Sequence, residues 1–143
     1  MTRHAREAVS LAVATALGEA ALYGLVITDW SQVGGVALVF AFLIGPALFV
    51  ALLAWRRRTH PVRSRVLFGL AVVIAVVGLS VLGYDLYRFD ADPQFRQKPN
   101  MHSLIVPMVQ WGMIGVVWFW LVVQEAQEKR AAKELGRPPI VPK

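Results

Sequence analysis

Residues Val66–Tyr84 read VLFGLAVVIAVVGLSVLGY, an apolar run without a charged residue that indicates the fold class of this chain. An α-helix needs about 20 apolar residues to cross a hydrocarbon core about 30 Å thick, at a rise of about 1.5 Å per residue. Three more apolar stretches of similar length occupy much of the 143-residue chain, namely Ala8–Ile27, Val33–Trp55 and Leu104–Val123. The sequence therefore predicts an all-α, polytopic membrane protein, a bundle of four transmembrane helices forming one domain over residues 1–143.

The composition agrees with a membrane protein and excludes several kinds of chemistry. Hydrophobic residues make up 57% of the chain and charged residues 17%, and the charges lie almost entirely between the apolar stretches. A net charge of +6 could attract nucleic acid, but the basic residues flank apolar runs, where they set orientation in the bilayer. We therefore expect no nucleic-acid partner. The chain has no cysteine, which excludes disulfides and thiolate metal sites.

The distribution of Lys and Arg predicts how the chain is oriented. Basic residues concentrate near the N-terminus, in the Arg-rich loop 56–65 and after residue 128, whereas the segments 28–32 and 85–103 together carry three. Cytoplasmic loops of membrane proteins carry an excess of Lys and Arg. Both termini and the loop 56–65 are accordingly predicted to be cytoplasmic, with the chain integral to a cell membrane such as a bacterial inner membrane.

The N-terminal segment has a second interpretation. Arg3 and Arg6 precede an apolar run, which is the pattern of a signal peptide, and residues 18–20 offer a small-residue cleavage zone. Glu19 inside the run favours a retained first span.

The first span carries a continuous face of small residues at a spacing of four positions. That face consists of Ala8, Ala12, Ala16, Ala20 and Gly24. Small residues let two helix backbones approach closely in a membrane. We therefore expect this span to be buried against a neighbouring helix, in this chain or in a second copy.

Glu19 is the one acidic or basic residue well inside a span. A charged side chain at that depth costs about 2.5 kcal/mol or more, and no Lys or Arg within a span can pair with it. Thr15 and Tyr23 lie four residues to either side on the same edge of the helix. We expect Glu19 to be protonated, or hydrogen-bonded to Gln110, to Thr15 or to another hydroxyl.

Two roles for Glu19 remain open. It could bind a proton or a cation, with Tyr23 and Trp111 supplying aromatic faces. In this respect the chain is similar to the small multidrug transporters, which have four spans and an embedded acid in the first. The chain departs from that family in its longer outer loop, in its C-terminal extension and in lacking a matching glycine pattern in span four. Alternatively, Glu19 is a hydrogen-bond clamp between helices.

The second and fourth spans carry further features. Gly45 and Pro46 lie near the middle of span two and predict a kink, because proline removes a backbone hydrogen bond. The last span is predicted to continue as a cytoplasmic helical stalk over residues 124–135, followed by a short tail over 136–143. Glu125 stands four residues before Lys129, a spacing that supports a helix. The stalk is either a solvated helix end or a docking site for a cytoplasmic partner.

No catalytic or metal-binding set is recognisable. His4, His60 and His102 all lie outside the spans, so no histidine pair could hold a membrane haem. We expect no cofactor, no metal site and no enzymatic activity. The chain is predicted to be an accessory or structural subunit of a larger membrane assembly. Its expected contacts are the lipid bilayer and other membrane subunits, or a second copy through span one. The alternative is a homo-oligomeric transporter or channel for a small molecule or ion that uses Glu19.

Overall fold

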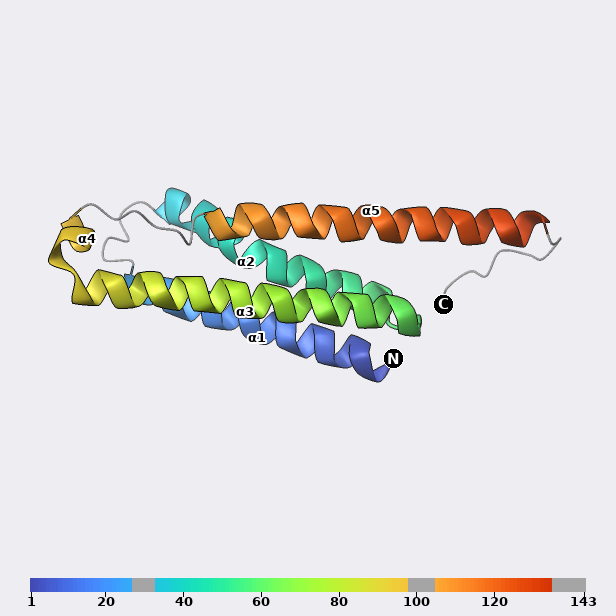
Figure 1. The fold of residues 1–143 in the computed structure, drawn as a ribbon, viewed down its shortest axis with the longest axis horizontal. Helices are drawn as coiled ribbons and strands as arrows, with labels where there is room; N and C mark the ends of the chain where they lie inside the picture. The colour runs from blue at the N-terminus through green and yellow to red at the C-terminus, as the bar shows by residue number, and fades with distance from the viewer. Residues whose placement is uncertain (27–32, 98–104, 135–143) are drawn as a thin grey trace.

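Helices form all the regular structure in residues 1–26, 33–97 and 105–134, which are the residues that the computed structural model describes. They are α1 (Arg3–Val26), α2 (Val33–Arg56), α3 (Pro61–Ala91), α4 (Pro93–Gln97) and α5 (Ile105–Glu134). The all-α class is therefore confirmed for this part of the chain. Figure 1 shows the N-terminus, the α2–α3 turn and the C-terminal end of α5 near one end of the molecule, and α4 at the other. The predicted tail 136–143 lies outside the described residues.

Prolines set both ends of α3, which is longer than the predicted span 66–84. The helix has Pro61 in its first turn, where a missing N–H costs little and the fixed φ favours helix. It ends at Ala91 because Pro93 disfavours the helical conformation in the preceding residue, and Asp92 is extended (φ −117°, ψ 106°). The apolar stretch marked only the middle of this 31-residue helix, since helix formation does not require the flanking residues to be apolar.

Asp92 joins α3 to α4. Its Oδ1 atom accepts hydrogen bonds from the backbone N–H groups of Gln94 (2.9 Å) and Phe95 (3.3 Å), as an N-cap residue does. These two backbone donors, Phe95 first, hold the pKa of the Asp92 carboxyl below its usual range. Arg88 pairs with the other carboxylate oxygen at 3.2 Å and stacks on the Phe95 ring at 4.7 Å. The segment predicted as an outer loop therefore begins with ordered structure.

The small-residue face of α1 packs within the chain itself. Ala8, Ala12 and Ala16 are almost fully buried, in clusters with residues of α2, α3 and α5, while Ala20 and Gly24 are half-buried. α1 makes its most extensive contacts with α3 and α2. Methyl side chains on this face let the backbones of α1, α2 and α3 approach closely.

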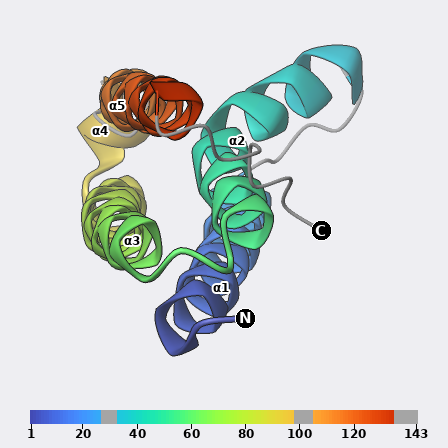
Figure 2. The same ribbon diagram turned by 90° about the vertical axis from the view of Figure 1, so that its right-hand side faces the viewer.

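Gly45 and Pro46 of α2 shape the contact with α5. Figure 2 shows that α2 changes direction along its length, and Pro46 lies inside the helix. A Cβ atom added at Gly45 would lie 2.9 Å from Cζ2 of Trp111, so the glycine makes room for the indole ring. The same ring packs against Phe49 with centroids 5.7 Å apart. Trp111 is thus a packing residue between α5 and α2.

Ion pairs attach α5 to the α2–α3 turn. The Arg57 guanidinium contacts Glu125 at 2.7 Å, and Arg63 contacts Glu128 at 2.5 Å and Glu125 at 3.6 Å. The Arg63 side chain is only 7% exposed, so its pairing is shielded from water better than that of a surface pair. The first turn of the predicted stalk is accordingly held by the chain's own arginines.

Two of the described helices, α3 and α5, are long and apolar enough to cross a membrane. A shorter apolar helical segment, Ala41–Arg56, lies in α2. Two apolar helices that could span a membrane thus agree with a membrane location.

We predict that Gly45→Ala destabilises the fold by about 1 to 3 kcal/mol, the usual cost of overpacking a filled contact. The matched control is Gly112→Ala, where an added Cβ meets nothing within 4 Å. Both substitutions gain the same helix propensity, so the difference isolates the clash with Trp111. Unfolding midpoints in detergent measure it, and equal midpoints for the two variants would contradict this packing.

Candidate functional site

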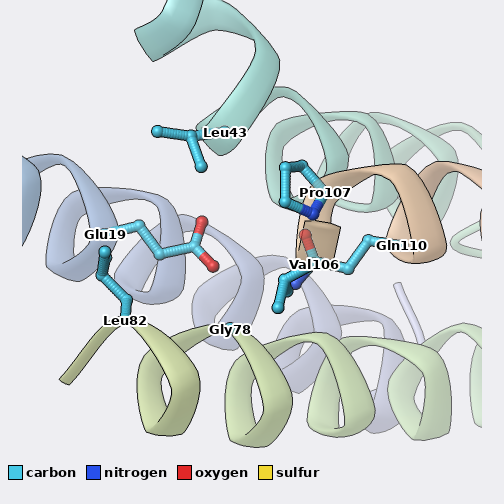
Figure 3. A pocket seen from close by; sticks show the side chains of 7 residues that line it. All are labelled: Glu19, Leu43, Gly78, Leu82, Val106, Pro107 and Gln110. Atoms are coloured by element: carbon cyan, nitrogen blue, oxygen red, sulfur yellow. The ribbon is translucent and has the colours of Figure 1, made fainter. Parts of the chain in front are cut away.

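The buried polar cluster of this protein forms where α1, α3 and α5 meet. Glu19 of α1 is 5% exposed and Gln110 of α5 is 1% exposed. Figure 3 shows the Glu19 carboxyl group extending over Gly78 of α3, toward α5. Residues distant in sequence are therefore brought together among apolar side chains, where polar groups need partners.

Hydrogen bonds connect all three helices at this point. The Gln110 amide donates from Nε2 to the backbone carbonyl oxygen of Ile74 in α3 at 3.3 Å. The Gln110 side chain also hydrogen-bonds the Glu19 carboxyl group. The second carboxyl oxygen of Glu19, Oε2, is buried and has no hydrogen-bond partner. Gln110 is thus a bridge between α1 and α3, and Glu19 retains one atom that could hold a proton or bond a small ligand.

Gly78 provides the space that the two polar side chains occupy. A Cβ atom at this position would overlap the Glu19 carboxyl group and lie 2.9 Å from Nε2 of Gln110. Gly78 was hard to select from the sequence, because it is one of several small residues in a valine-rich helix. Its only available signal was its place near the middle of that span, where a glycine weakens a helix unless something needs the space.

The cavity beside Glu19 is very small. Its volume is about 10 Å³, and apolar lining residues join Glu19, Gly78 and Gln110 around it. Those apolar residues, all drawn in Figure 3, are Leu43, Leu82, Val106 and Pro107. A cavity needs about 10 to 15 Å³ to hold one water molecule. The space fits one water at most, so a proton or a water can be accommodated there and an organic substrate cannot.

The other residues predicted for this site lie outside the cavity lining. Thr15 is buried and donates from Oγ1 to the carbonyl oxygen of Leu11 in its own helix at 2.8 Å. Tyr23 is half-buried on the next turn of α1 beyond Glu19. Trp111 lies against α2, as described above. Of the five predicted polar and aromatic residues, the structure brings Glu19 and Gln110 together.

Clusters of metal-ligating side chains can be examined in the described ranges. Within residues 1–26, 33–97 and 105–134, no group of three or more His, Asp or Glu side chains could hold a metal ion. Comparison with protein-family models, with curated proteins and with solved structures finds no match to this chain. The function must therefore be argued from the geometry.

We predict that Gln110→Leu destabilises the bundle, because it leaves the Glu19 carboxyl group without its amide partner. Glu19→Leu and the double variant complete a double-mutant cycle, whose coupling energy is expected at about 0.6 to 1.7 kcal/mol. Unfolding in detergent provides the measurement. Glu19→Gln serves as the control, since it keeps shape and hydrogen bonding. Strictly additive effects would contradict a direct Glu19–Gln110 interaction.

Proposed function

We propose that this chain is a four-span integral membrane protein with both termini in the cytoplasm, acting without catalysis as an accessory subunit of a larger membrane assembly. The observation that carries the membrane placement is the exposure of large apolar side chains on all four long helices. Examples are Leu17 of α1, Leu48 of α2, Val76 of α3, and Val116 and Phe119 of α5, the last two being 72% and 66% exposed. Water-soluble proteins rarely expose apolar patches on this scale.

The packing of the helices supports four spans rather than two. α1 and α2 have 24 residues each, which corresponds to about 36 Å of helix and exceeds the thickness of a hydrocarbon core of about 30 Å. Both run beside α3 (Figure 1), so a bilayer crossed by α3 would also surround them. The N-terminus joins the α2–α3 turn, where Thr2 donates its backbone N–H to the Arg58 carbonyl oxygen at 2.8 Å. This gathers basic residues at one end, as the positive-inside rule requires.

Cysteine labelling tests this topology, because the chain has no cysteine of its own. Thr59→Cys in the α2–α3 turn should react with a membrane-impermeant maleimide only after intact cells are permeabilised. Gln94→Cys in α4 should react in intact cells, because α4 lies at the opposite end. Val76→Cys, which faces lipid in this proposal, is the control and should resist the polar reagent on both sides. Labelling of both Thr59→Cys and Gln94→Cys in intact cells would contradict the four-span arrangement.

The accessory role is supported by the cavity beside Glu19 and by the end of α5. A cavity for one water offers no route for an organic substrate through a single copy of the chain. Beyond Glu125 and Glu128, which pair with Arg57 and Arg63, the helix continues to Glu134 with side chains that are exposed on nearly every side. A polar helix without packing of its own suits a protein that docks on a partner.

Purification in mild detergent, followed by mass spectrometry of co-purifying chains, tests the accessory role. A stable set of other membrane proteins is expected. Neutralising Lys129, Arg130 and Lys133 to Gln should release a partner bound at the stalk, because these exposed cations are removed without touching the Arg57 and Arg63 ion pairs. Arg6→Gln is the control at the same end. A homodimer free of other chains would contradict the accessory role.

The unpartnered Oε2 atom of Glu19 favours a second candidate, a homo-oligomeric transporter or channel for a proton or small cation. Since α2 and α3 cover much of the small-residue face of α1, a second copy would contact the free side of that helix, where Val13 and Leu17 are exposed. In proteoliposomes, Glu19→Gln should then abolish proton flux while the protein still inserts. Under the accessory role the same variant keeps its partners and shows no change in flux.

A further inference from the structure

A second cavity lies between the start of α3 and α5, away from Glu19. It has a volume of about 230 Å³ and is lined by residues 60–63 and by Trp120, Gln124 and Glu128. This is far more than one water molecule requires. Unlike the cavity beside Glu19, it has room for a small polar group.

A buried cation lines this cavity. Arg63 is 6% exposed, and its guanidinium holds Glu128 at 2.5 Å. Guanidinium groups present several N–H donors in a plane and match the oxygens of a phosphate as well as those of a carboxylate. An incoming phosphate could therefore bind Arg63 together with Glu128, or displace Glu128 from Arg63.

The N-terminus of α3 adds a second source of positive potential to the same cavity. His60 is the N-cap residue and makes no side-chain cap hydrogen bond, and Pro61 follows it. The first N–H groups of a helix lack intrahelical partners and favour anions, helped by the helix dipole. The buried guanidinium and this uncapped helix end thus act on one space.

The surroundings carry an excess of positive charge. Among the arginines of the loop 56–65, Arg57 and Arg63 pair with Glu125 and Glu128, and Arg58 stacks on Trp55 at 4.9 Å. Arg56 and Arg65 are exposed. Arginines therefore outnumber the acidic partners here, which favours an anionic ligand over a zwitterionic one.

The position and the apolar rim favour a lipid over a free ion. Trp120 lines the cavity, and Trp118 is exposed two residues earlier, as aromatic residues at a membrane interface are. Val62 lines the cavity while remaining 65% exposed, and Val66 is exposed one turn further along α3. An acyl chain could lie along these valines while its headgroup enters the cavity.

We propose that the cavity between the start of α3 and α5 binds the phosphate headgroup of an anionic phospholipid from the cytoplasmic leaflet. The Arg63 guanidinium and the backbone N–H groups of Val62 and Arg63 donate to the phosphate oxygens, since Pro61 has no N–H and that of Ser64 bonds to the His60 carbonyl. Trp120 closes the apolar side. The inference rests on the proposed membrane placement. Basic pockets between helices on the cytoplasmic side of membrane proteins are suited to such headgroups.

The test measures the unfolding midpoint of delipidated protein in nonionic detergent during titration with phosphatidylglycerol, phosphatidylcholine or sodium phosphate. Phosphatidylglycerol should raise the midpoint with saturation, at a concentration about tenfold below that of phosphatidylcholine. Both phosphates can accept the same hydrogen bonds, but the excess of arginines repels the choline cation. Sodium phosphate should have little effect. Equal effects of both lipids would overturn the proposal, and a phosphate effect equal to that of phosphatidylglycerol would assign the site to the free ion.

Three variants separate a built site from general charge attraction. Arg63→Gln should weaken phosphatidylglycerol binding about tenfold, whereas Arg3→Gln, which removes the same charge from an exposed pair with Glu7, should not change it. Glu128→Gln should tighten binding, because it removes the carboxylate that competes for Arg63. If Arg63→Gln fails to fold, Glu128→Gln decides, and weaker binding by it would overturn the proposal.

A last control distinguishes this inference from the membrane placement. The protein is reconstituted in phosphatidylcholine vesicles and extracted with alkaline carbonate. Retention in these vesicles combined with no preference for phosphatidylglycerol overturns the lipid site alone. Release from them overturns the membrane placement itself.

Discussion

Close packing of α1 against α2 and α3 along its alanine face sets the positions of the other groups in this structure. Ala8, Ala12 and Ala16 are buried in that contact, and each contributes only a methyl group to the space between the helices. Because the backbones approach closely, Glu19 on the adjacent edge of α1 reaches across Gly78 to the amide of Gln110. A larger residue at these alanines would move α1 outward and separate the polar groups that now satisfy one another. The hydrogen bond between Glu19 and Gln110 therefore depends on the packing of the small residues of α1.

The two ends of α5 are attached to the other helices by different interactions. Near its start, Gln110 bonds to α3 and Trp111 fills the space left by Gly45, so the contact is one of short-range packing and hydrogen bonding. Near the cytoplasmic end of the proposed topology, Arg57 and Arg63 hold Glu125 and Glu128 by charge. Between them α5 exposes most of its apolar surface, which lipid would cover in a bilayer. This division agrees with a helix that crosses a hydrocarbon layer and leaves it at the turn containing Glu125.

Both polar sites combine satisfied and unsatisfied groups. Gln110 is shared between two helices, yet Oε2 of Glu19 lacks a partner beside a space for one water. Arg63 is paired, yet it lines a much larger cavity at an uncapped helix end. Buried polar groups are costly when unpaired, so such positions are where a bound water, proton or headgroup gains most. The first space holds at most one water, whereas the second has room for a larger polar group.

The apolar runs of 19 to 23 residues were enough to predict helices and the middle of each long one, because runs of that length have few other stable forms. It also singled out Glu19 and Gln110, since polar residues are conspicuous in such runs. No sequence pattern predicted that Gly78 lies beneath Glu19 or that Trp111 packs on Gly45. The same holds for the bonds of Glu125 and Glu128 to arginines more than sixty residues earlier. The physical reason is that α3 and α5 are apolar on both their packed and their exposed faces. Periodicity of hydrophobic residues then carries no information about the rotation of each helix about its axis, and rotation decides which side chains meet.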